Sequence, residues 1–379
     1  MPNMPKMQPT SSDRHRFHLL DGLRGIAAAS IVIWHAPSYL GTRNFLHQAF
    51  LAVDFFFCLS GFVIAFSYEK RILSGLKVGD FFIMRLIRLY PVYWIGTMLG
   101  SLFLLVDLGL ENALHLKARL LALFLLSLTL LPGFNSIDSL ALFPLDPPAW
   151  SLFMELIGNV VIAWLLFKHF ANNWVLSFLA ILSLLVLIHW TRPGWNVDCG
   201  WVYARSNFVL GMARVFLSFT IGILLLRLSR YRPLPKIQGW LLPSAIIALL
   251  AFALVAPFTL LRTQSFQLLT VSVLFPLMVY FGALANPPGS WTRACVFLGE
   301  ASYPLYLLHL TLLRILNISY VVSFLSSNHF FGKVAVGVVT LIITVVSYGV
   351  AKMYDEPVRK FLFKRYTASI QPRLNPVTQ

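Results

Sequence analysis

Long apolar runs separated by short polar connections form the main pattern of this chain. The runs lie near residues 23–40, 49–68, 89–106, 119–131, 150–167, 174–190, 207–226, 240–260, 266–285, 296–316 and 334–352. A helix that spans a bilayer needs about 20 apolar residues, with a lower limit of about 17. The run 119–131 is too short, and Pro132 and Gly133 end it. The pattern therefore predicts about ten transmembrane helices.

Basic residues predict how these helices are oriented. If the N-terminus is cytoplasmic and 119–131 does not cross, most of the 30 Lys and Arg residues fall on the cytoplasmic side, as the positive-inside bias requires. If 119–131 crossed, the basic loop 227–236 would be moved outside. We therefore expect an all-α, polytopic integral membrane protein with both termini cytoplasmic and with segment 107–149 outside. Its parts are an N-terminal cytoplasmic segment 1–18, a transmembrane domain 19–352 and a basic cytoplasmic tail 353–379.

Composition excludes several classes of protein. Hydrophobic residues make up 58% of the chain and charged residues only 12%, and the mean hydropathy is +0.76. Soluble domains carry about 25% charged residues, so a soluble enzyme, a disordered chain and a disulfide scaffold are all excluded. The net charge of +16 fits basic loops against anionic lipids better than nucleic-acid binding. The three cysteines lie far apart without metal-ligand spacing, so no metal site is expected.

Ionisable side chains inside the apolar runs are candidates for function, because they are costly at membrane depth. The predicted orientation places all of them in the outer half of the membrane, where they would surround a polar cavity open to the outside. For Asp54, Arg214 and Arg314, structural pairing between helices is the competing interpretation. His35 and Glu155 are the stronger functional candidates. The full set is His35, Asp54, Glu155, Arg214, His309 and Arg314.

A second group of charges lies at the predicted inner face. Arg85 and Arg88 are three residues apart and share one helical face. They are either cytoplasmic anchors of the helix or clamps for phosphate, which suits the guanidinium fork. Arg24 begins the first span and His35 follows eleven residues later, a rise of roughly 16 Å along the helix. One helix therefore connects the inner face to the predicted outer cavity.

Five ordered motifs resemble the acyltransferase 3 family of membrane-bound O-acyltransferases, which modify bacterial surface polysaccharides and related glycans. They are LLDGLRGIAAASIVIWHA, FLAVDFFFCLSGFVIAFSY, RLIRLYPVYW, PPAWSLFMELIGNVV and LGEASYPLYLLHL, and they cover about residues 19 to 355. The resemblance implies ten membrane helices with both ends cytoplasmic, and a place in the bacterial cytoplasmic (inner) membrane. Many relatives read WSLSVE where this chain has WSLFME, so Phe153 and Asn159 are positions where acceptor contacts could differ.

The resemblance also implies roles for individual residues. Arg24 and His35 match an essential Arg–His pair on the first helix, and Arg85 and Arg88 match a basic pair on the third. Glu155 matches an acidic residue that follows Trp150 and Ser151. A late motif matches Ser302, Tyr303, Tyr306 and His309.

From these roles we expect transfer of an acyl group, most simply acetyl, from acyl-CoA to a sugar hydroxyl of a glycan or lipid-linked saccharide. His35 is the expected base, because imidazole titrates near neutral pH, and Glu155 would orient it or replace it. Direct transfer and an acyl-histidine intermediate both remain open. Acyl-CoA would be a substrate and not a bound cofactor, held by Arg24, Arg85 and Arg88.

The remaining polar residues are expected to shape the substrate cavity. These are Asp54, Ser60, Trp150, Ser151, Arg214, Tyr303, His309 and Arg314. Ser60 is a weak candidate nucleophile, because SGF lacks the pattern of a nucleophile elbow. A multi-pass transporter or flippase for a lipid-linked or small polar substrate is the alternative function. It would suit a polar cavity and ten helices equally well.

Overall fold

The computed structural model describes residues 17–44, 46–107, 114–133, 141–190, 197–202, 204–256, 264–316 and 329–374. Nearly all of them are helical, as predicted. The elements are α1 (His18–Leu40), η1 (Ala49–Leu51), α2 (Ala52–Leu73), α3 (Val78–Asp107), α4 (Leu114–Ser127), α5 (Ala149–Phe167), α6 (Asn173–Trp190), α7 (Arg205–Tyr231), β1 (Ile237–Gln238), α8 (Leu241–Val255), α10 (Gln264–Leu269), η2 (Thr270–Leu274), α11 (Phe275–Leu284), β2 (Ala285–Asn286), α12 (Gly289–Leu316), α14 (His329–Val350), η3 (Ala351–Asp355) and α15 (Glu356–Leu374). The two short strands pair in parallel.

Within these residues, nine helices are long and apolar enough to cross a membrane. The prediction of an all-α polytopic membrane protein is therefore confirmed. The described part of the run 240–260 forms α8, which has 15 residues. Ala256 is already extended where α8 ends, because the proline that follows it in the sequence disfavours helical backbone. The run 119–131 falls in α4, which has 14 residues and is also too short to span.

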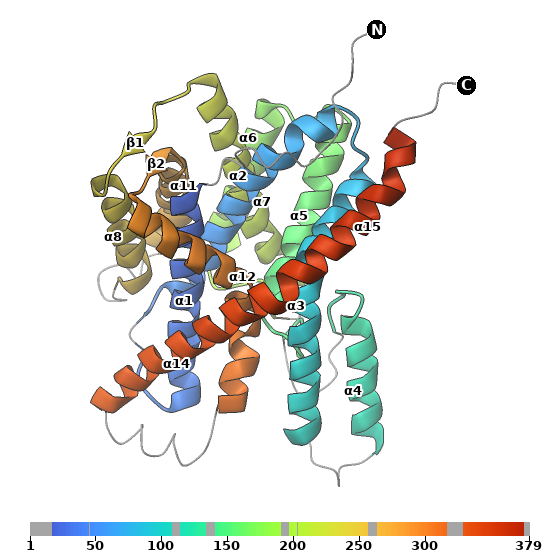
Figure 1. Ribbon diagram of the computed structural model, residues 1–379, viewed down its shortest axis with the longest axis vertical. Coiled ribbons are helices and arrows are strands. Elements are labelled where there is room, and N and C mark those ends of the chain that lie inside the picture. Colours follow the sequence, from blue (N-terminus) through green and yellow to red (C-terminus); the bar gives the residue numbers. More distant parts are fainter. Residues whose placement is uncertain are drawn as a thin grey trace.

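The helix ends alternate between the two ends of the molecule. Figure 1 shows the α2–α3 and α5–α6 connections and the last turns of α7 at the same end as the end of α15. The ends of α1, α3 and α12 lie at the opposite end. This is the alternation that the charge pattern requires. Which end is cytoplasmic stays a prediction.

Two helix pairs form the centre of the bundle. The packing of α1 against α12 is the most extensive, followed by that of α2 against α7. Gly61 and Gly222 let α2 and α7 approach closely: a Cβ at Gly61 would lie 2.1 Å from the Phe219 carbonyl oxygen, and one at Gly222 would lie 2.1 Å from that of Cys58. Small residues serve this purpose widely in membrane helices.

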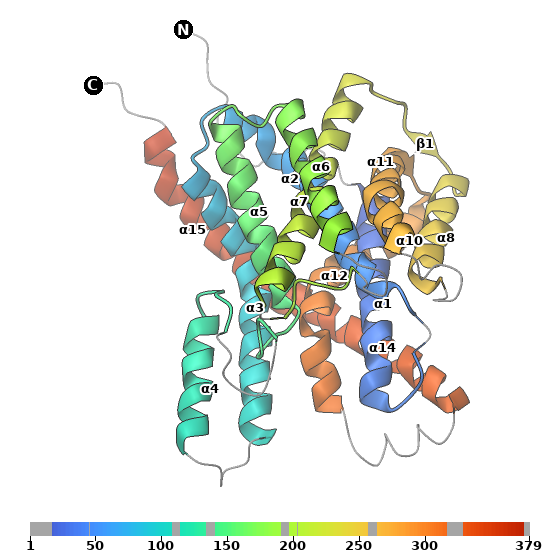
Figure 2. The same cartoon turned by 180° about the vertical axis from the view of Figure 1, so that it is seen from behind.

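The last span continues beyond its predicted end. A π-helical turn, η3, joins α14 to α15, so the chain remains helical from His329 to Leu374. Figures 1 and 2 show this long helix crossing the other helices obliquely. Residues 353–374 were expected to belong to a polar basic tail, and the structure shows that they are helical and that α15 contacts α3.

Candidate functional site

A cavity of about 220 Å³ lies where α1, α2, α3, α5 and α12 meet. Its polar wall contains most of the residues that the sequence singled out. They are Arg24, Ser60, Arg85, Arg88, Ser151, Glu155, Ser302, Tyr303 and Tyr306. Apolar side chains of α2, including Phe56 and Phe57, form much of the remaining wall. The motifs that lie far apart in sequence therefore converge on one space.

Glu155 is held by two side chains inside this cavity. Its Oε1 accepts a hydrogen bond of 2.9 Å from Nη2 of Arg85 and one of 2.5 Å from Oγ of Ser60. The Arg85 and Glu155 side chains are only 13% and 14% exposed. A charged pair at this degree of burial is strongly coupled, because removing one partner leaves the other uncompensated.

The other two arginines of the cavity are anchored to α12 and to the last helix. Nε of Arg24 donates to Oγ of Ser302 over 2.8 Å, and its Nη2 donates to the Gly299 carbonyl over 2.7 Å. Arg88 lies over the ring of Tyr303 at 5.5 Å and pairs with Asp355 of η3 at 3.7 Å. The Tyr303 hydroxyl donates to the Leu89 carbonyl. Among the described residues that line the cavity, three guanidinium groups are accompanied by a single carboxylate, that of Glu155.

His35 does not line this cavity. It lies beyond Tyr306, whose hydroxyl is 2.8 Å from Oγ of Ser151 and whose ring centroid is 6.1 Å from that of His309. His309 in turn is hydrogen-bonded to His35, with 3.2 Å between His309 Nε2 and His35 Nδ1. Tyr306 and His309 therefore connect the cavity wall to the imidazole of His35.

The hydrogen bonds determine which nitrogens of this histidine pair carry protons. Nδ1 of His309 is 2.6 Å from the Tyr306 carbonyl, and Nδ1 of His35 is 3.0 Å from the Ile31 carbonyl. Because a carbonyl only accepts, both Nδ1 atoms carry hydrogen. Neutral His309 then accepts at Nε2 from His35 Nδ1–H, whose single hydrogen is shared between the Ile31 carbonyl and His309. This leaves Nε2 of His35 with a free lone pair, which is what a general base needs.

Two expectations about this site are wrong. Among the described residues, the hydrogen bonds of Glu155 go to Ser60 and Arg85, and His309 takes the orienting position at His35 instead; that Glu155 could replace His35 as base stays a prediction. Glu155 was also expected in the outer half of the membrane and Arg85 at the inner face. The structure brings the two together in an ion pair. The reason lies in the helix limits: α3 begins at Val78 and α5 only at Ala149, so Arg85 and Glu155 are each about two turns into their helices.

Asp54, Arg214 and Trp150 were expected to shape the cavity, and the structure places them elsewhere. Arg214 binds Asp54 through two hydrogen bonds, of 3.0 Å and 2.6 Å, and both side chains are fully buried. It also donates to the Cys199 carbonyl over 2.6 Å and lies 5.5 Å from the Trp150 ring. A satisfied, bidentate buried pair of this kind joins α2 to α7. For Asp54 and Arg214, the structure therefore agrees with the competing interpretation, in which they pair to hold helices together.

Arg314 is also absent from the cavity wall, and its charge acts on Asp146. Asp146 is 1% exposed, and neither of its carboxylate oxygens has a hydrogen-bond partner among the described residues. Burial raises the pKa of Asp146 well above its ordinary value, and the charge of Arg314 partly opposes this rise. Asp146 was not among the predicted residues, because segment 107–149 was expected outside the membrane, where a carboxyl would be solvated and not buried within the protein. The sequence feature that could have identified Asp146 is its position just before Pro147 and Pro148, directly ahead of an expected span.

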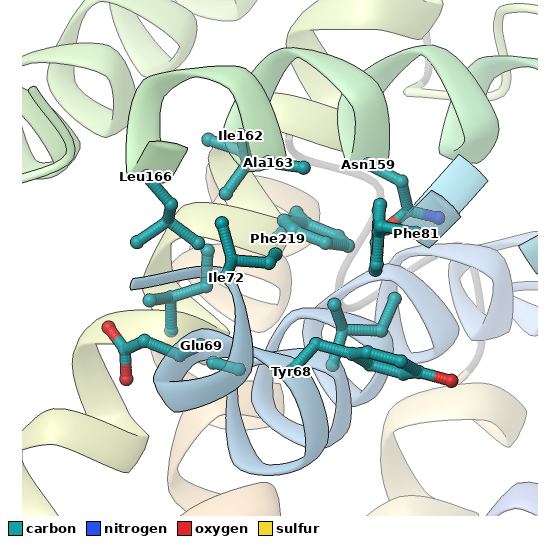
Figure 3. Close-up of a pocket in the computed structure, with 12 residues that line it drawn as sticks. Tyr68, Glu69, Ile72, Phe81, Asn159, Ile162, Ala163, Leu166 and Phe219 are labelled. Atoms are coloured by element: carbon teal, nitrogen blue, oxygen red, sulfur yellow. The ribbon is translucent and has the colours of Figure 1, made fainter. Parts of the chain in front are cut away.

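A second cavity lies between α2, α5 and α7, and Figure 3 shows its mostly apolar lining. Ile72, Ile162, Leu166 and Phe219 face one another there. Its volume of about 10 Å³ is close to that of a single water site. Both side-chain atoms of Asn159 lack a hydrogen-bond partner among the described residues. The cavity is too small for a substrate, so Asn159 lies away from the candidate site.

Comparison with known proteins identifies the class. A family model described as an acyltransferase domain, that of the acyltransferase 3 family, matches residues 17–350. The chain is therefore a membrane-bound acyltransferase. It belongs to the acyltransferase 3 family, as the motifs predicted. These comparisons give no support to the transporter alternative.

Individual relatives agree with this assignment. "Protein 2 in picA locus" of Rhizobium radiobacter is 40% identical over 41% of this chain and 84% of its own length. A protein of Staphylococcus aureus named "Putative O-acetyltransferase" is 26% identical over 90% of this chain, and the match spans 57% of that protein. The exopolysaccharide production protein ExoZ of Rhizobium meliloti is 27% identical over 73% of this chain and 80% of its own length. No solved structure matches the chain.

Proposed function

We propose that this protein transfers an acyl group, most simply acetyl, from cytoplasmic acyl-CoA to a sugar hydroxyl of a surface or exported glycan. The observation that carries this proposal is the cavity in which Arg24, Arg85 and Arg88 converge, one side chain away from the paired histidines. Guanidinium groups suit the phosphates of such a donor. The names of the relatives, a putative O-acetyltransferase and an exopolysaccharide production protein, support the acetyl group and the glycan acceptor.

In the proposed reaction, Nε2 of His35 removes the proton of the sugar hydroxyl. The oxygen then attacks the thioester carbonyl, the carbon–sulfur bond breaks, and the thiolate of CoA takes the proton from the imidazolium. In a covalent route, His35 Nε2 would attack the thioester first and pass the acyl group to the sugar in a second step. Trapping of an acyl-enzyme and ping-pong kinetics distinguish the covalent route from direct transfer.

Transfer also requires the thioester to reach His35. Tyr306 stands between the cavity and the histidine pair, held by its hydrogen bond to Ser151. We infer that the Tyr306 side chain turns aside when the donor is bound. The donor then approaches from the cavity and the alcohol from the opposite end of α1. A site in the bacterial inner membrane would give the enzyme access to both substrates.

The test replaces the proposed base. Cells that lack the protein are complemented with wild type, His35→Ala or the control His189→Ala, which changes an exposed histidine on α6. Mass spectrometry then measures O-acylation of the cell-surface glycans. We expect His35→Ala to lower acylation roughly 10²-fold or more, with protein levels unchanged and the control at wild-type activity. Wild-type acylation by His35→Ala would remove His35 as the base.

A further inference from the structure

Asp355 brings the last helix into contact with the candidate site. It ends the π-helical turn η3 and is 2% exposed. Its Oδ2 lies 3.7 Å from Nη1 of Arg88 and 2.9 Å from Nη2 of Arg359. Two guanidinium groups therefore share one carboxylate oxygen. Asp355 and Arg359 lie beyond the residues that the family model matches, which end at residue 350.

This arrangement leaves positive charge at the edge of the cavity. Arg88 lines the cavity, and Arg359 is held beside it by the carboxylate they share. The two positive charges of Arg88 and Arg359 exceed the single negative charge of Asp355. The side chains of Arg88 and Arg359 are 36% and 28% exposed. Nε of Arg359 is itself buried and has no hydrogen-bond partner among the described residues, so the exposed part of this side chain lies elsewhere on it. Held in place and accessible, these guanidinium groups can bind an anion.

The size of the cavity indicates which part of a donor would meet these arginines. A volume of about 220 Å³ is below the roughly 300–1,000 Å³ typical of sites that enclose drug-sized ligands. A donor of the acyl-CoA class is larger than most drugs. Its thioester arm can therefore enter, while its phosphorylated nucleotide part has to remain outside, next to the side chains at the rim.

We propose that Arg359, held beside Arg88 by Asp355, binds a phosphate group of the acyl-CoA donor outside the cavity. This inference rests on the proposed function and adds to it a binding residue from the last helix. The planar guanidinium donates two parallel hydrogen bonds to phosphate oxygens. Asp355 is a positioning residue, because it acts through the two arginines. A phosphate of an anionic lipid headgroup offers the same chemistry, so the experiment has to separate the two sources.

The experiment measures binding of two thioesters to the purified full-length protein in a neutral detergent. Acetyl-CoA carries phosphates, whereas S-acetylpantetheine has the same thioester arm without them. The variants are Arg359→Gln and the control Lys360→Gln, which changes the next residue, a 74% exposed lysine paired with Glu356. We expect Arg359→Gln to raise the Kd of acetyl-CoA about tenfold and to leave that of S-acetylpantetheine unchanged. Lys360→Gln should match wild type for both.

A second pair of variants tests the positioning role of Asp355. Asp355→Asn should raise the Kd of acetyl-CoA alone, while Glu356→Gln, a change in a neighbouring carboxylate that pairs with Lys352 and Lys360, should not. Asp355→Glu, which restores the carboxylate, should recover part of the affinity. The melting temperature of each variant, measured in the same detergent, separates this effect from unfolding.

Three results would overturn the inference. One is an unchanged Kd of acetyl-CoA in Arg359→Gln, and another is an equal loss for both thioesters, which would indicate a structural role. The third is a rise in the Kd of acetyl-CoA for Arg359→Gln that occurs only when phosphatidylglycerol is added to the micelles. In that case the site would bind a lipid headgroup. If wild type binds neither thioester, the proposed donor itself is contradicted, and the inference with it.

Discussion

The histidine pair determines how one nitrogen becomes available for chemistry. His309 carries its proton on Nδ1 because that atom faces the Tyr306 carbonyl, so its Nε2 can only accept from His35. His35 was predictable as a candidate base from the sequence, since it is an imidazole inside an apolar run. Its partner was not, because the two histidines are 274 residues apart and meet only through the packing of α1 against α12.

His309 can be tested with two amides that imitate different ring nitrogens. The terminal atoms of Gln reach the position of Nε2, so His309→Gln can still accept from His35. The terminal atoms of Asn reach only the position of Nδ1. His309→Asn therefore keeps the hydrogen bond to the Tyr306 carbonyl and loses the hydrogen bond to His35. We expect kcat to stay within a few-fold of wild type in His309→Gln and to fall about 10²-fold in His309→Asn. KM for the donor should be unchanged in both.

The measurement is initial-rate kinetics with acetyl-CoA and glycan isolated from cells that lack the protein. Both amides remove the same ring from the same buried site, so a general loss of packing should affect them alike. Equal activity of the two variants would contradict the orienting role of His309.

Pairing between charged side chains could not be predicted from sequence. The cost of burying a charge predicts that Asp54, Glu155 and Arg214 have partners, but not which ones. The structure pairs Asp54 with Arg214 and Glu155 with Arg85. Only the second pair lines the cavity, so Asp54 and Arg214, which were expected around the same site as Glu155, have a structural position instead.

At the scale of helices, the approach of α2 to α7 positions part of the candidate site. Ser60, which binds Glu155, is adjacent to Gly61, and Gly61 packs directly on the backbone of α7. A methyl group at Gly61 would force the two helices apart, because backbone atoms cannot turn away as a side chain can. The sequence shows the glycine in SGF but not the helix that requires it.

We expect Gly61→Ala to lower the stability of the protein by about 1–3 kcal/mol, the usual cost of overpacking. Gly79→Ala is the matched control, because no heavy atom of a neighbour lies within 4 Å of a Cβ there and alanine favours a helix. Thermal unfolding in detergent should show a lower melting temperature for Gly61→Ala and an equal or slightly higher one for Gly79→Ala. Equal melting temperatures for the two variants would mean that α2 and α7 do not pack this closely.

Helix limits account for most differences between the expected and observed elements. Hydrophobicity located the helices, but α3 and α12 begin several residues before their apolar runs, and α15 extends through a basic segment. In each case polar residues that hydropathy assigns to a loop are helical because they pack on other helices. Arg85 and Asp355 are both in such extensions, which is why the pairing of Arg85 with Glu155 and of Asp355 with Arg88 was not foreseen.

For the whole molecule, the distribution of charge predicts an orientation in the membrane that helix length alone does not provide. Nine described helices are long enough to span, and α8 is short. If α8 did not cross, the segments after it would change sides, including the basic α15. The positive-inside bias therefore favours a bundle in which α8 crosses together with the nine long helices and the end of α15 is cytoplasmic.

Cysteine labelling tests this orientation. The native cysteines Cys58, Cys199 and Cys295 are all buried, so they should give little background with a maleimide that cannot cross membranes. Arg43→Cys would place an exposed thiol after α1, and Ser74→Cys would place one between α2 and α3. In intact spheroplasts we expect the thiol at position 43 to react and the one at position 74 to react only after permeabilisation.

The unmodified protein, labelled with and without permeabilisation, is the control for the buried native thiols. A third variant, Lys364→Cys on α15, decides the number of crossings. If α8 crosses, position 364 shares the protected side with position 74, and if it does not, position 364 reacts in intact spheroplasts. The second result would place Arg359 and Asp355 on the outer side, away from cytoplasmic acyl-CoA. The orientation of the last helix and the donor site proposed on it therefore depend on the same measurement.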